Sequence, residues 1–497
     1  MKTLITIFFA RLVKKRNNKW IYNPLDTQAK TFNKLILKAA NTEFGRDHKF
    51  SKIKNYKDFK KQVPIRGYED IKPYVDKVVA GEKNILWPGK PLYFAKTSGT
   101  TSGAKYIPIT KESIKTHINS ARDALLNYFL EKKNFKPING KHMFLQGSPR
   151  LEKKNGIFIG RLSGISAHYI PKLFLNNRKP SWKTNCIEDW EEKVDTIIKE
   201  TVGEKMTIIA GIPSWVQMYF EKIVFNENKT IKEVFPELSL YVYGGVSYDP
   251  YKSTFDKLFG RQVDTLATFP ASEGFFGYQD NFTNDTNDLL LLLNNDIFYE
   301  FIKAEDFLKG EYERITLEDV QVNVNYLLII STSAGLWCYN IGDTIKFTSI
   351  KPFRIIVTGR IKHFLSAFGE HVISEEVENS MKIATNLYGV TIREFTVAPL
   401  INPREGLPCH EWYVEFETPP KEMKIFSKTL ETEMINQNIY YRDLVYGGII
   451  KPLEVISVKK GGFNHYMKSV GRLGGQNKVP RLSNDRKIAD KLNAFNS

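Results

Sequence analysis

The sequence predicts an α/β protein with a large N-terminal domain and a smaller C-terminal α+β domain. Three observations support this prediction. The chain has 497 residues, which is more than one hydrophobic core usually serves. Its middle alternates strand and helix patterns, and short alternating strands follow Leu289. A separate pattern of helices and strands begins near residue 360. We expect domains over 1–359 and 360–497, the first with mostly parallel sheets and a small antiparallel, barrel-like part.

The first elements are helical, up to about residue 89, with Asp26 as a candidate helix cap. Strands are then expected over 92–95 and 105–109, with a loop over 97–103 between them. Thr110 has the residue type of a helix N-cap, and a helix pattern follows it. These elements lead into the alternating part of the chain.

The alternating part predicts a parallel sheet with helical crossovers. Its strands are expected over 206–210, 238–243 and 263–268, and its helices over 213–225 and 250–259. Antiparallel strands are expected over 326–331, 335–339, 343–347 and 354–358. In the smaller domain we expect strands over 394–399, 411–416 and 453–458 and a helix over 420–436.

Composition limits the classes of protein that the chain can belong to. Hydrophobic residues make up 42% and aromatic residues 13%, which indicates a folded chain rather than a disordered one. The formal net charge is +17, so the surface attracts anions such as nucleotides, nucleic acid or acidic lipid. The sequence has no basic stripe with interleaved base-stacking aromatics, so we expect no specific nucleic-acid partner.

The three cysteines are Cys186, Cys338 and Cys409, which lie far apart. This spacing predicts neither a disulfide framework nor a structural zinc site, and it favours a reducing, cytoplasmic location. No apolar run approaches the roughly 20 residues of a membrane span.

The N-terminal segment has the pattern of an amphipathic helix. Its apolar side is expected to dock on the body of the protein, and it consists of Ile5, Phe8, Phe9 and Leu12. Contact of this helix with a membrane surface is the alternative.

The most informative motif spans 97–105 and reads Thr-Ser-Gly-Thr-Thr-Ser-Gly-Ala-Lys. Such a loop exposes backbone N–H groups and hydroxyls that can hold phosphate oxygens, and Lys105 adds a positive charge at its rim. The candidate phosphate-binding residues are Ser98, Gly99, Thr100, Thr101, Ser102 and Gly103. A solvent-exposed hairpin loop without a ligand is the alternative.

Two acidic motifs follow along the chain. Ala271, Ser272 and Glu273 follow a predicted parallel strand, where a carboxylate is well placed to hold Mg²⁺ on a nucleotide. Further on, Tyr339 to Asp343 includes a Gly-Asp pair, and Asp343 can accept hydrogen bonds from a ribose diol. A solvated turn and a plain β-hairpin are the respective alternatives.

A last motif, 475–481, is a Gly- and Pro-marked loop that contains Lys478 and Arg481. The order of these motifs resembles the acyl-adenylate-forming superfamily, and within it the auxin-responsive acyl acid amido synthetase family, also called Gretchen Hagen 3. The similarity extends from about residue 23 to 482. It is carried by the motifs at 97–105, 270–277, 334–343 and 476–481.

The resemblance implies a ligase that uses ATP and Mg²⁺ to join a small carboxylic acid to an amino acid. It implies a C-terminal domain that moves between the two half-reactions. The implied roles are catalysis for Lys478 and Lys105, metal binding for Glu273, nucleotide binding for the residues named above together with Tyr339, Asp343 and Arg360, and a hinge at Lys362. The oligomeric state is left open.

Two departures from the family pattern stand out. Asn340 occupies a position where Arg is more frequent, and Pro270-Ala271 replaces the usual Ala-Ser. Two other readings stay open: a ligase that passes the same acyl-adenylate to coenzyme A or a carrier thiol, and a non-catalytic basic protein that binds acidic membrane or nucleic acid.

Overall fold

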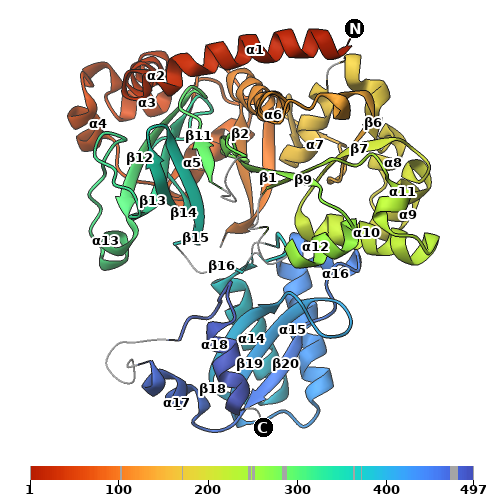
Figure 1. Ribbon diagram of the computed structural model, residues 1–497. Coiled ribbons are helices and arrows are strands. Elements are labelled where there is room, and N and C mark those ends of the chain that lie inside the picture. Colours follow the sequence, from red (N-terminus) through yellow and green to blue (C-terminus); the bar gives the residue numbers. More distant parts are fainter. Residues whose placement is uncertain are drawn as a thin grey trace.

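Two bodies make up the molecule, a large α/β domain and a smaller C-terminal domain below it in Figure 1. The predicted fold class is confirmed. The computed structural model describes residues 2–100, 103–170, 172–244, 248, 252–282, 288–361, 364–365, 367–370, 372–470 and 479–495.

An 11-stranded sheet organises the large domain, in the order β12-β13-β14-β15-β11-β10-β9-β8-β7-β3-β6. Its parallel half comprises β3 (Lys141–Phe144), β6 (Arg178–Lys179), β7 (Met206–Ala210), β8 (Leu240–Gly244) and β9 (Asp264–Ala271). The crossover helices are α10 (Pro213–Glu227) and α12 (Lys252–Phe259). These elements confirm the predicted alternation, because their continuous apolar runs are buried between helical layers.

The antiparallel half continues the same sheet, because β9 pairs with β10. It comprises β10 (Gly274–Tyr278), β11 (Leu289–Leu291), β12 (Ile297–Lys303), β13 (Asn325–Thr332), β14 (Tyr339–Ile350) and β15 (Phe353–Arg360). The predicted strand at 335–339 is wrong, since Gly335 takes a left-handed φ of 87° in a turn. The chain enters β14 only at Tyr339.

A second sheet of four strands, β2-β1-β5-β4, carries the Ser/Thr/Gly-rich motif. Its strands are β1 (Tyr93–Thr100), β2 (Gly103–Ile109), β4 (Glu152–Lys154) and β5 (Ile157–Gly160). Thr110 caps the following helix α6 (Lys111–Glu131), as predicted, and its hydroxyl accepts a hydrogen bond from the N–H of Ser113. Further helices are α7 (Leu162–Ser166), α8 (Trp182–Asn185), α9 (Trp190–Thr201), α11 (Ile231–Val234) and α13 (Ala304–Lys309).

The first residues form five helices. They are α1 (Lys2–Ile21), α2 (Pro24–Ala39), α3 (Glu43–Asp47), α4 (Tyr56–Gln62) and α5 (Tyr68–Val79). The predicted cap at Asp26 is wrong: Asn23 is the N-cap of α2, and Asp26 lies in the first turn. Pro24 suits this start because the first turn of a helix does not need its N–H.

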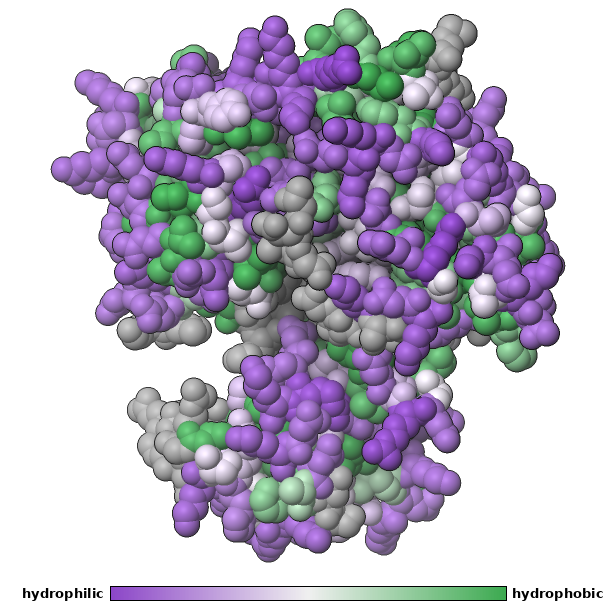
Figure 2. Space-filling model, in the orientation of Figure 1, coloured by the Kyte–Doolittle hydropathy of each residue, from purple (hydrophilic) through white to green (hydrophobic). Residues whose placement is uncertain are grey.

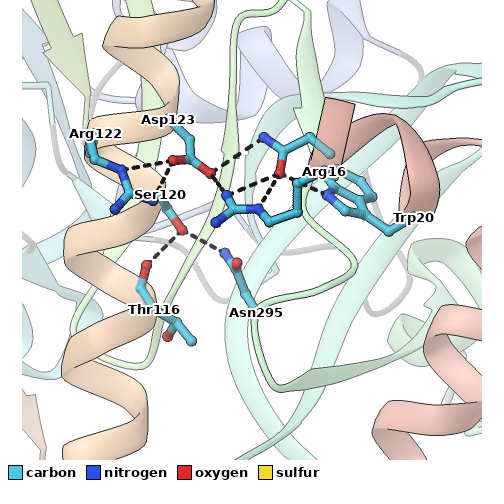
Figure 3. A network of polar contacts seen from close by, with 8 residues as sticks. Arg16, Trp20, Thr116, Ser120, Arg122, Asp123 and Asn295 are labelled. Carbon is cyan, nitrogen blue, oxygen red and sulfur yellow. Dashed lines mark hydrogen bonds and ion pairs between the residues drawn. The ribbon is translucent and has the colours of Figure 1, made fainter. Parts of the chain in front are cut away.

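Helix α1 does not dock by the predicted side. Ile5, Phe8, Phe9 and Leu12 are exposed, and the opposite side is buried through Ala10, Val13 and Trp20. The docked side of α1 makes polar as well as apolar contacts. Asn17 and Arg16 both donate hydrogen bonds to Asp123 of α6 (Figure 3). The predicted side is wrong because polar contacts with α6, which the pattern within α1 does not report, set the rotation of the helix. None of the helices in the described part of the chain combines the length and hydropathy that spanning a bilayer requires.

The C-terminal domain packs helices on the three-stranded sheet β18-β19-β20 and confirms the predicted α+β pattern. Its strands are β16 (Phe364–Leu365), β17 (Val372–Ile373), β18 (Thr391–Leu400), β19 (Cys409–Thr418) and β20 (Glu454–Val458). Its helices are α14 (Ser374–Tyr388), α15 (Met423–Gln437), α16 (Ile439–Tyr446), α17 (Gly462–Ser469) and α18 (Lys487–Leu492). The large core extends to Ile355 and the C-terminal core begins at Leu365. The boundary between residues 359 and 360 and the mobility of this domain stay predictions.

Candidate active site

The Ser/Thr/Gly-rich motif forms a hairpin that is tighter than the predicted loop. Strand pairing continues through Thr97 opposite Lys105, and Thr100 lies opposite Gly103. Ser98 and Gly99 lie in β1, whereas Thr101 and Ser102 lie outside the described residues. Extended backbone suits this segment because β-branched Thr favours strands.

Lys105 lies next to Tyr68 at the start of α5. Its ammonium is 5.7 Å from the centroid of the Tyr68 ring. The Tyr68 hydroxyl accepts a hydrogen bond of 2.8 Å from the backbone N–H of Tyr106, and burial raises the pKa of Tyr68 to about 12. The ring is therefore neutral at physiological pH and presents its face to the cation. This contact holds the Lys105 side chain beside the hairpin.

The same short segment also contacts the third motif. The backbone N–H of Arg66 donates to the carbonyl of Cys338 at 3.0 Å, and the N–H of Asn340 donates to the carbonyl of Arg66 at 2.8 Å. These two bonds bracket Tyr339, which is buried. Residues 66–68 thus join Lys105 to Tyr339, two of the predicted site residues that lie far apart in the sequence.

Asp343 lies on a bulge within β14 and not in a β-hairpin turn, which was the alternative interpretation of this motif. Asn340 pairs with Ile329 and Thr344 pairs with Leu327, so the residues between them are in excess on β14. Gly342 provides the left-handed conformation, with φ of 85°. Asn340 supports the bulge, because its side-chain oxygen accepts a 2.8 Å bond from the Gly342 N–H. Asn340 therefore has a structural role here, although it departs from the family pattern.

The bulge places Asp343 opposite Arg360, the last residue of β15. Asp343 is buried, with 7% of the residue exposed. Backbone pairing therefore brings two of the predicted nucleotide-binding positions together at one end of the β14–β15 pair.

A buried ionic network includes Cys338, the residue before Tyr339. Arg314 donates to the sulfur of Cys338 at 2.6 Å and lies 3.3 Å from the Glu300 carboxylate. The Cys338 thiol donates to Glu300 at 3.2 Å, and the Tyr56 hydroxyl donates to Glu300 at 2.9 Å. Burial raises the pKa of Glu300 above its usual range and that of Cys338 well above its own. The network fixes the backbone where β14 begins.

The second motif lies at the turn between β9 and β10. Ala271 pairs with Gly274, and Ser272 and Glu273 form the turn, both half-buried. A Cβ on Gly274 would lie 2.6 Å from the side chain of Ile297 and 2.9 Å from that of Phe276, so a larger residue here would require these side chains to shift. Glu273 thus follows the carboxyl end of a parallel strand, as predicted. Within the described ranges, no group of three His, Cys, Asp or Glu side chains is arranged to hold a metal ion.

Two predicted residues, Lys362 and Lys478, lie outside the described residues. Their roles, like the other assignments of function to single residues, stay predictions. The side chain of Arg360 is also outside the description, although its backbone is placed.

The C-terminal domain contacts the large domain beside the first motif. Arg161 forms an ion pair with Asp443, and its guanidinium lies 5.0 Å from the ring centroid of Tyr440. The Tyr440 hydroxyl donates to the backbone carbonyl of Lys96 at 3.4 Å, one residue before the motif begins. Sequence reasoning missed these residues and Tyr68, because no local pattern marks contacts across such separations.

Three family models match the chain. The GH3 family N-terminal domain matches residues 13–184, the central domain residues 290–360 and the C-terminal domain residues 375–487.

Similar proteins along nearly the whole chain are named as amino acid or amido synthetases. A jasmonoyl–L-amino acid synthetase, JAR4, from Nicotiana attenuata is 22% identical, with 91% of this chain and 90% of that protein covered. An indole-3-acetic acid-amido synthetase, GH3.3, from Arabidopsis thaliana is 21% identical, with 94% and 91% covered.

Solved structures share the fold. The AtGH3.15 acyl acid amido synthetase in complex with 2,4-DB has a TM-score of 0.62 at 16% identity, covering 98% of this chain and 96% of that one. A 2-hydroxyisobutyryl-CoA ligase has a TM-score of 0.60 at 13% identity, covering 97% and 92%. With family models matching the N-terminal, central and C-terminal parts, the chain belongs to the GH3 family.

Proposed function

We propose that this protein is an ATP-dependent ligase that adenylates a small carboxylic acid and transfers the acyl group to the amine of an amino acid. The observation that carries the proposal is the segment 66–68, which joins Lys105 of the Ser/Thr/Gly-rich hairpin to Tyr339 of the Gly-Asp motif. Relatives over nearly the whole chain are amido synthetases, which supports the same reaction class.

In the first step a carboxylate oxygen attacks the α-phosphorus of ATP, the bond to the bridging oxygen breaks, and pyrophosphate leaves. Both reactants are anions, so the site must supply positive charge and N–H groups. We assign this task to the hairpin at 97–105 with Lys105, and to Lys478. Tyr68 keeps the Lys105 ammonium beside the hairpin. We assign the ribose hydroxyls to Asp343, since the bulge presents a carboxylate beside Arg360.

Mg²⁺ fits the second motif. Glu273 is half-buried in a two-residue turn at the end of a parallel strand, and Mg²⁺ is usually held by one or two carboxylates together with substrate phosphates. When bound, the ion would offset negative charge on the phosphates.

In the second step the amine nitrogen attacks the acyl carbon, the bond to the adenylate oxygen breaks, and AMP leaves. An activated acyl group must be protected from water. We assign this role to the C-terminal domain, and the contacts of Tyr440 and Asp443 with the large domain beside the hairpin support the assignment. We propose that the C-terminal domain rotates about Lys362 between the two steps. The rotation would replace these contacts with others and bring Lys478 to the ATP phosphates for the first step.

The test is exchange of labelled pyrophosphate into ATP across a panel of carboxylic acids, followed by mass spectrometry with pooled amino acids or coenzyme A. We expect acid-dependent exchange and an amide product. A thioester with coenzyme A and no amide would replace the acceptor in this proposal with a thiol. No exchange with any acid, together with salt-sensitive retention on anionic surfaces, would favour the non-catalytic basic protein.

A further inference from the structure

The outer face of α1 is an exposed apolar stripe that continues into basic residues. Leu4 is 73% exposed and Phe8 67%, and Leu12 is also exposed. Spacing of four residues puts these three side chains on one face of the helix. Lys15 and Lys19 continue the same face by helical periodicity, and both are exposed. We call Leu4, Phe8, Leu12, Lys15 and Lys19 the outer face of α1.

Helix α1 is held in a fixed rotation, so this face points to solvent. Arg16 and Asn17 bind Asp123 of α6, and the Trp20 indole donates to Asn17 at 3.2 Å (Figure 3). Lys14 pairs with Glu131, the last residue of α6, at 2.5 Å. Rolling the apolar face inward would break these contacts and expose Trp20, which is buried. The exposure is therefore part of the folded state.

The surroundings of this face are apolar and positively charged. Hydrophobic side chains gather over the N-terminal half of α1, at the top of the view in Figure 2. Ile5 and Phe9 border the stripe, and Arg11 flanks it. Helix α1 contains no Asp or Glu. Scattered exposed apolar side chains are ordinary, but a clustered set beside cations is typical of helices that lie in a lipid headgroup region.

We propose that the outer face of α1 binds an anionic lipid surface. The apolar half would enter the boundary between headgroups and acyl chains, and the lysines would lie among the phosphates. A second copy of this chain is a poorer partner, because each copy has a formal net charge of +17 and would bring basic surface against basic surface. The family match begins at residue 13, so the apolar half lies before it.

The position of α1 allows binding and catalysis together. In Figure 1 the helix runs along the top of the large domain, and the C-terminal domain lies at the bottom. A membrane on this face would leave the contact between the domains unobstructed.

The test is co-sedimentation of the full chain with vesicles. One set contains phosphatidylcholine and phosphatidylserine, and the other contains phosphatidylcholine alone. We expect association with the anionic vesicles, weakened by added salt. The variant Leu4→Gln/Phe8→Gln should weaken it by at least about 30-fold, since it removes two apolar side chains that would enter the lipid. Lys15→Gln/Lys19→Gln should weaken it by roughly 30-fold.

The matched control is Leu37→Gln/Phe225→Gln, which removes two side chains that are 79% and 86% exposed elsewhere on the surface. It should bind like the wild type, and pyrophosphate exchange should be unchanged in all three variants. The proposal fails if the wild type does not bind anionic vesicles or binds neutral vesicles equally well. It also fails if the control variant loses as much binding as the two α1 variants. If the wild type binds no vesicles but forms a dimer in solution, and Leu4→Gln/Phe8→Gln is monomeric, the outer face of α1 would instead bind a second copy of the chain.

Discussion

Arg161 of the large domain forms an ion pair with Asp443 of the C-terminal domain. The pair is partly exposed, with 28% and 33% of the two side chains accessible, and the guanidinium also lies over Tyr440. It joins the two bodies beside the hairpin that we assign to phosphate binding. The C-terminal core also packs against Trp215 and Met218 of α10, so the ion pair is one of several contacts that set the position of this domain.

Removing this pair should loosen the domain contact. A partly exposed ion pair contributes on the order of 0.5–1 kcal/mol, so Arg161→Ala should raise amide hydrogen exchange in α16 by about 2-fold to 5-fold. The matched control is Arg150→Ala, because Arg150 pairs with Glu188 at 3.3 Å on the exposed surface of the large domain. Equal exchange in α16 for both variants would contradict a role for Arg161 in positioning the C-terminal domain.

Removing a charge from the buried network of Glu300, Arg314 and Cys338 should lower the stability more than removing Arg161 does. Arg314→Leu would leave the Glu300 carboxylate buried without its charge partner, and such changes cost about 3–5 kcal/mol. We expect a lower unfolding midpoint and a raised KM for ATP, because the start of β14 shifts. The double variant Glu300→Gln/Arg314→Leu should recover much of the stability. A double variant no more stable than Arg314→Leu would argue against the pairing.

His117 provides a pH test of the large domain. It is buried on α6, and burial lowers its pKa to about 4, against 6.5 for an exposed histidine. The unfolded chain therefore binds the proton more tightly, so stability is complete above about pH 6.5 and falls as the pH approaches 4. The loss attributable to His117 at pH 4 is about 3 kcal/mol. Urea unfolding at several pH values should show this slope in the wild type and a flatter one in His117→Gln.

Asp343 should govern nucleotide affinity. Asp343→Ala removes the carboxylate that we assign to the ribose and should raise the KM for ATP by roughly 10-fold, since a hydrogen bond to a charged group contributes about 1.5 kcal/mol. Circular dichroism should show an intact fold. Asp288→Ala is the control, because that carboxylate accepts a bond from Thr348 on the surface of the same sheet. An unchanged KM for ATP in Asp343→Ala would reject the ribose assignment.

Sequence patterns predicted the helices and strands that are determined by residues close together in the chain. Thr110 caps α6 because its side chain reaches an N–H three residues on, and strand β7 follows from one run of apolar residues. The bulge at Asp343 and the contact of Lys105 with Tyr68 depend on partners from other parts of the chain. The side of α1 that docks depends on Asp123 of α6, more than 100 residues away, which no periodicity within α1 can report.

The central claim is that the chain activates a carboxylic acid with ATP through charge supplied by its C-terminal domain. The most direct measurement compares acid-dependent pyrophosphate exchange in the wild type, Lys478→Ala and the control Lys468→Ala, which changes an exposed lysine of α17. The account predicts at least about 100-fold slower exchange for Lys478→Ala alone, since one transition-state charge partner contributes about 2.7–4 kcal/mol. Wild-type exchange in Lys478→Ala would contradict it.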